Sequence, residues 1–158
     1  MILADWSDLF VAAAGASAAL AGLIIVAMSV NIETIVKFES LPSRAAATIA
    51  LMVLVVVVSI AGLVPELSIM ALGWIVLAAS GVGLVVALDS GWRMVKPGLG
   101  SGIAKSLVVL APIVAMAIGG GMLAAGNIAG LYAVATGMAL AFVGAVLNSW
   151  VLLVEIRR

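Results

Sequence analysis

The chain has 158 residues, of which 66% are hydrophobic and only 9% charged, with a mean hydropathy of +1.43. Soluble domains carry charge on about a quarter of their residues, so this composition is that of an integral membrane protein. The net charge of zero gives no electrostatic basis for binding nucleic acid. Cysteine and histidine are both missing, which excludes disulfides, haem ligation by imidazole and the usual zinc and nucleophile arrangements. We therefore expect no enzyme, no cofactor and no metal.

Five apolar runs have the length of membrane-crossing helices, which need about 20 residues each. We predict an all-helical integral membrane protein, a single domain over residues 1–158, with spans at 9–30, 45–63, 67–88, 106–125 and 129–153. Pro65 and Glu66 separate the second span from the third, and Asn127 lies between the last two. No Lys or Arg precedes the first apolar run, so we expect that span to be retained and not cleaved as a signal peptide.

The basic residues predict the orientation of the chain. With five spans, all seven fall on one side of the membrane: Lys37, Arg44, Arg93, Lys96, Lys105, Arg157 and Arg158. Because basic residues near span ends favour the cytoplasm, the N-terminus is expected outside and the C-terminus inside. The only charges on the outer side are then Asp5, Asp8 and Glu66. Four spans would place basic groups on both sides, which disfavours that alternative.

The first span contains a seven-residue repeat that we call the seam. One row consists of Asp5, Ala12, Ala19, Val26 and Glu33, and the other of Asp8, Gly15, Gly22, Ser29 and Val36. Together the rows have a period of 3.5 residues, which is the geometry of left-handed supercoils. The seam is mostly small within the membrane and acidic at both ends. The large residues lie off it: Phe10, Leu20, Leu23, Ile24 and Met28.

Two interpretations of the seam are open. In the favoured one, the first span lies at the centre of the bundle, where small residues let helices of the same protomer approach closely. In the other, several copies assemble with the seam toward a common axis. Asp5 and Asp8 would then form outer acidic rings, Glu33 an inner ring, and Val26 a hydrophobic constriction. A substrate cavity is a third, weaker possibility.

The later spans differ in the size of their side chains. The second contains the bulky run LMVLVVVVSI and is expected to face lipid. The fourth contains Pro112 and the triplet Gly119, Gly120 and Gly121, which predict a kink, or alternatively a broken helix at an ion site or gate. The fifth has small residues at four-residue spacing, typical of close helix packing: Ala133, Gly137, Ala141 and Ala145.

The run FVAAAGASAALAGLIIVAMSVNIE, followed by LPSRAA, resembles small multi-span bacterial membrane proteins of unknown function. The resemblance covers the first third of the chain. It implies a bacterial inner (cytoplasmic) membrane and carries over no activity and no functional residue.

The most concrete functional interpretation is a non-enzymatic, homo-oligomeric channel for cations or small neutral solutes, with the first span along the permeation path. The alternative is an accessory or assembly subunit that packs on a larger membrane complex and conducts nothing. A small-solute transporter ranks third, because no acidic or basic residue lies well inside a span. In every case the lipid bilayer is the expected partner, and nucleic acid is not.

Overall fold

The computed structural model describes residues 2–30, 32, 40–94 and 99–155. These residues form helices and no strand. The elements are a short 3-10 helix η1 and the helices α1, α3, α4, α5 and α6, with bounds Ile2–Trp6, Ser7–Val30, Ser40–Gly62, Ile69–Met94, Leu99–Ala124 and Gly130–Glu155. Each predicted span coincides with one of the five long helices. For most of the helix ends, the observed and the predicted bounds differ by only a few residues.

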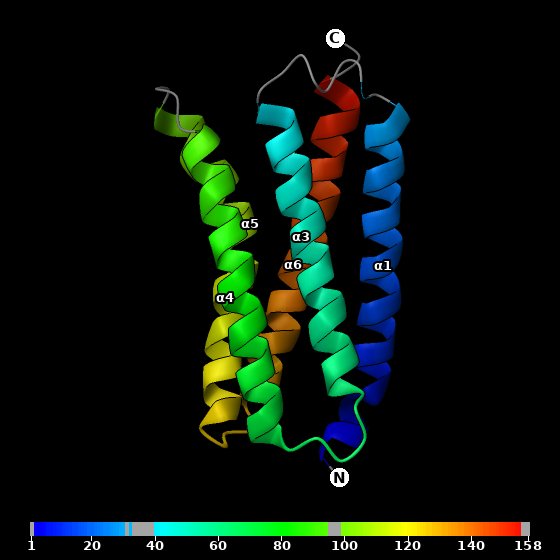
Figure 1. Ribbon diagram of the computed structural model, residues 1–158, viewed down its shortest axis with the longest axis vertical. Coiled ribbons are helices and arrows are strands. Elements are labelled where there is room, and N and C mark those ends of the chain that lie inside the picture. The colour runs from blue at the N-terminus through cyan, green and yellow to red at the C-terminus, as the bar shows by residue number, and fades with distance from the viewer. Residues whose placement is uncertain (1, 31, 33–39, 95–98, 156–158) are drawn as a thin grey trace.

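The long helices run up and down beside one another (Figure 1). One end of the bundle holds the N-terminus, the α3–α4 loop and the α5–α6 loop, and we call it the N-terminal end. Helix α6 ends at the opposite end, called here the C-terminal end. Helices α4, α5 and α6 pack closely in sequence order, α3 contacts all the other long helices, and α1 lies at the edge against α3.

Four described stretches are long and apolar enough to cross a membrane, namely Leu3–Val30, Ala45–Gly62, Ile69–Leu88 and Gly130–Trp150. Helix α5 adds a shorter apolar stretch, Val108–Ala124. These helices indicate a membrane protein, because a soluble bundle would cover such lengths with polar side chains on one face.

Local signals in the sequence explain where the helices end. Helix α5 ends at Ala124 and is closed by Gly126, whose φ of 80° is easy for glycine alone; the Asn127 amide donates to the Met122 carbonyl oxygen at 2.8 Å. This is the Schellman arrangement that closes many helices. At the start of α4, the Ser68 hydroxyl accepts a hydrogen bond from the Ala71 amide at 3.1 Å, as an N-cap does.

The expectation that the second span faces lipid is wrong. In the apolar part of α3, 61% of the residues are buried, against 22% in α1 and in α4. The large side chains Met52, Val55 and Val58 fill the space between the surrounding helices. Bulk alone does not separate a lipid-facing helix from a central one, because lipid and the protein core are equally apolar.

Helix α5 is continuous from Leu99 to Ala124 and passes through Pro112, so the broken-helix alternative is wrong. Proline lacks an amide hydrogen and therefore frees the carbonyl four residues earlier, which belongs to Val108. That oxygen lies against α6 at Gly144, where an added Cβ would come within 3.2 Å of it. Helix α6 thus has no side chain at the point where α5 has a freed carbonyl. The kink itself stays a prediction.

Candidate functional site

Helix α1 packs on the bundle through one stripe of buried residues, two of them large and two small: Phe10, Ala13, Ser17 and Ile24. The Phe10 ring covers Gly62 at the end of α3 so closely that a Cβ there would lie 2.6 Å from the ring. The Ser17 hydroxyl donates to the Ala13 carbonyl oxygen of its own helix at 2.6 Å, which satisfies it without a partner helix.

The seam lies on the other side of α1. Every described member from residue 5 to residue 29 is exposed: Asp5, Asp8, Ala12, Gly15, Ala19, Gly22, Val26 and Ser29. A Cβ added at Gly15 or Gly22 would meet no atom within 4 Å. The interpretation that the seam packs inside its own bundle is therefore wrong. Glu33 and Val36 lie outside the described residues.

The reason for this orientation is the packing that each face can provide. Phe10 and Ile24 make more dispersion contacts with neighbouring helices than alanine or glycine would. The bundle therefore takes the face that carries Phe10 and Ile24, and the seam is left outside. A small-residue row allows close approach but does not determine which helix approaches it.

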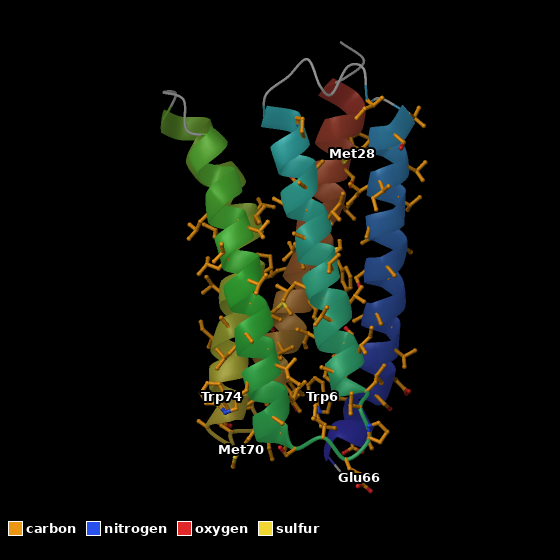
Figure 2. The ribbon with its side chains drawn as sticks, viewed as in Figure 1. Trp6, Met28, Glu66, Met70 and Trp74 are labelled. Carbon is orange, nitrogen blue, oxygen red and sulfur yellow. The ribbon has the colours of Figure 1, made fainter. Side chains whose placement is uncertain are left out.

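The acidic residues with described side chains gather at the N-terminal end of the bundle. Asp5 belongs to η1, Asp8 to the first turn of α1, and Glu66 to the α3–α4 loop. All three are exposed, and Glu66 points away from the bundle (Figure 2). Asp8 also complements the positive end of the α1 dipole. Among the described residues, no three acidic side chains come together in a way that could hold a metal ion.

Small residues in α4, α5 and α6 have the opposite environment. A Cβ at Gly119 would lie 2.7 Å from the Gly130 carbonyl oxygen, and one at Gly120 would lie 2.9 Å from Val76 Cγ1. On α6, the predicted small row is largely buried, with Gly137 against Met116 and Pro112. The expectation of close packing there is confirmed. Gly121, by contrast, has no atom within 4 Å of an added Cβ.

Two contacts between distant segments were not predicted. The Asn148 amide nitrogen donates to the Thr48 hydroxyl at 3.0 Å, joining α6 to α3 across a separation of 100 residues. The Trp6 and Tyr132 rings meet edge to face, with centroids 4.9 Å apart, and join η1 to α6. The sequence shows uncharged polar and aromatic residues at these positions, but nothing in its periodicity pairs them.

Hydroxyl groups on the helices differ in whether they find a partner. Ser17, Ser149 and the exposed Thr136 each donate to a backbone carbonyl of their own helix. Ser59 on α3 and Ser80 on α4 are buried and have no hydrogen-bond partner in the described part of the chain. Each carries the cost of an unmade hydrogen bond in an apolar surrounding.

In the described part of the chain, three cavities adjoin η1, α1 or α3. One of about 530 Å³ lies at the N-terminal end, between η1 and the α3–α4 loop. A groove of about 440 Å³ separates α1 from α6 and is lined mainly by apolar side chains, including Leu23, Val26 and Trp150. A smaller one of about 340 Å³ lies between α1 and α3, beside Met28 and Ile49. The last two flank the C-terminal half of α1.

Comparison of the chain with protein-family models, with curated proteins and with solved structures gives no match.

Proposed function

We propose that the protein is a five-span protein of a bacterial cytoplasmic membrane, with its N-terminus outside. The proposal is supported by the distribution of charge along the bundle. The described acids Asp5, Asp8 and Glu66 belong to the N-terminal end, whereas the helix positions of Arg44, Arg93 and Lys105 belong to the opposite end. Positive charge marks the cytoplasmic side of membrane proteins.

Within that membrane, the protein is a homo-oligomeric channel whose α1 helices surround the permeation path. The observation that supports this proposal is the outward orientation of the seam. Copies can bring small residues to a common axis only if those residues face away from their own bundle, as Gly15, Ala19 and Gly22 do. The heptad period then lets α1 helices wind around one another with a left-handed twist.

The chemistry of the path follows from the seam residues. Asp5 and Asp8 lie at one mouth and raise the local concentration of cations there. Inside the membrane the path is lined by alanine, glycine and Val26, which is 60% exposed in the protomer. Such a lining offers no ligand for a dehydrated ion, so the path suits hydrated cations or small neutral solutes, with Val26 as the constriction.

The second candidate is an accessory subunit that packs on a larger membrane complex. It is favoured by the lack of any polar side chain on the seam between Asp8 and Ser29. Small residues without polar groups are the usual composition of a dry helix–helix contact in lipid. In this case a helix of another protein, and not a second α1, covers the seam.

Cysteine accessibility in reconstituted protein tests the channel. Because the chain has no cysteine of its own, each introduced cysteine is the only thiol present. We expect a water-soluble thiol reagent to modify cysteines placed at Gly15, Ala19 and Gly22. Leu23 and Ile25 are the matched controls, since both are exposed on α1 but lie off the seam, and they should not react.

The outcomes separate the two candidates. Reaction on the seam alone, together with solute flux across liposomes that this reagent blocks, supports the channel. Protection of all five positions in a protein that forms oligomers supports a dry contact and removes the channel. If the introduced cysteines are protected and the protein stays monomeric in lipid, the homo-oligomeric channel is excluded and the accessory subunit remains.

A further inference from the structure

The two halves of α1 are attached to the bundle very differently. In the N-terminal half, Phe10, Ala13 and Ser17 are all buried. The adjoining η1 adds Leu3 and Trp6, which pack against the core, and Trp6 contacts Tyr132 on α6. In the C-terminal half, Ile24 is the last buried residue, and exposure rises to 78% at Val30.

Cavities lie on both sides of this weakly attached half. The α1–α6 groove runs beside Leu20 to Ala27, and the α1–α3 cavity lies beside Ile25 to Ser29. Together they remove the close side-chain contacts that would fix a helix in place. Few contacts join α1 to α6, and in the other half of α1 the Phe10 ring covers Gly62 at the end of α3. Low local contact density is the structural mark of a segment that moves.

Gly22 lies just before the point where the attachment ends. It has no Cβ, and the space around it is open, so bending there meets no steric obstacle from another helix. Helices that bend sharply do so at proline, glycine or an inserted group, and Gly22 is the last glycine of α1. The weak point of the helix therefore lies within one turn of Ile24, where the tight contact ends.

We propose that α1 is a hinged arm. Its N-terminal half stays fixed to α3 and α6, and the half beyond Gly22 swings within the two cavities that flank it. Val26 lines the α1–α6 groove and also belongs to the seam, so a swing into that groove carries Val26 away from the seam axis. As a motion of the protomer, the arm does not depend on the proposed function. As a gate that opens the constriction, it rests on the channel proposal.

Distances between spin labels measure the motion. The full chain is labelled at cysteines that replace Val30 and Leu147, which lie on α1 and α6 toward the C-terminal end and are both exposed. The control pair replaces Val11 and Ile60, two exposed residues beside the Phe10–Gly62 contact. The protein is reconstituted in phospholipid nanodiscs with an excess of unlabelled copies, so that only distances within one protomer are recorded.

We expect the Val30/Leu147 distribution to be about twice as broad as that of the control pair. Gly22→Ala should narrow it, since alanine stiffens the helix, and Ala27→Leu should narrow it by filling the α1–α6 groove. Gly15→Ala is the matched control. It changes the same seam in equally open space but lies in the fixed half, and it should leave both distributions unchanged.

Equal widths for the two pairs would overturn the arm, and so would a broad distribution that neither Gly22→Ala nor Ala27→Leu narrows. Solute flux is measured on the same preparations. A broad distribution without flux removes the channel and keeps the arm. Flux with equal widths removes the arm and keeps the channel.

Discussion

The glycines of α1 and those of the α5–α6 contact differ in what surrounds them. At Gly119 and Gly130 an added Cβ would come within 2.7 Å or less of a backbone oxygen on the facing helix. At Gly15 and Gly22 it would meet nothing within 4 Å. The first pair already serves close packing inside the protomer. The second pair has the same chemistry but lies in open space on the outside of the protomer.

The difference shows that a row of small residues allows close contact between helices but does not show which helix makes that contact. In lipid, helices gain little from burying apolar area against each other, and packing quality decides the arrangement. The four predictions that follow test this contrast, beginning with the largest expected effect.

Gly119→Ala should lower the free energy of unfolding by about 3 kcal/mol, because the new methyl group is forced against the backbone of α6. Gly121→Ala, two residues along the same helix, has open space around it and should change stability by less than about 1 kcal/mol. Equilibrium unfolding in mixed micelles measures both. Equal effects would mean that the close approach of α5 and α6 is not as described.

Gly15→Leu together with Gly22→Leu should leave protomer stability nearly unchanged, because the side chains point into open space. If the seam joins copies, the same change should weaken their association tenfold or more, which is about 1.4 kcal/mol. Single-molecule photobleaching in liposomes measures the association by counting the copies in each complex. A matched variant with leucine at Ala16 and Ala18, which are exposed on α1 but off the seam, should associate normally.

The buried serines offer a similar comparison between polar groups, because some have a hydrogen-bond partner and others have none among the described residues. Ser59→Ala and Ser80→Ala should each raise the free energy of unfolding by about 1 kcal/mol, because each removes a buried hydroxyl without a partner. Ser17→Ala removes a bonded hydroxyl and should not stabilise the protein. The same unfolding titration applies. A loss of stability in Ser59→Ala would show that its hydroxyl is bonded after all.

The hydrogen bond between Asn148 and Thr48 should contribute least. A double-mutant cycle with Thr48→Val and Asn148→Ala should give a coupling of about 0.6 kcal/mol, the average for such bonds between membrane helices. Because this bond joins α3 to α6 and involves no seam residue, it should not alter association of copies. A coupling of zero would mean that the two side chains do not interact.

The sequence predicted the helices well because the signals for them are local. Apolar runs set their number, Pro65 and Asn127 mark two of the turns, and Gly126 closes α5 by its φ of 80°. The arrangement of the helices was less predictable. Helix α3 is apolar on all sides, and in a membrane protein hydrophobicity does not distinguish the core from the lipid.

The candidate site was predicted in part. The heptad rows group Gly15 and Gly22, which are both exposed, and leave Phe10 and Ile24, which are both buried, off the seam; Leu23 is also off the seam but exposed. Their direction was predicted wrongly, because direction depends on which face packs better against α3, a non-local quantity. The Asn148–Thr48 bond joins residues 100 positions apart and has no counterpart in any short pattern.

Oxidative cross-linking of Ala19→Cys in native membranes tests most directly whether the seam joins copies of the protein. Ala18→Cys is its control, since both residues are alanine, adjacent and exposed, and only Ala19 belongs to the seam. The account predicts a disulfide-linked dimer for Ala19→Cys and little for Ala18→Cys. Equal cross-linking at the two positions, or none at Ala19, would contradict it.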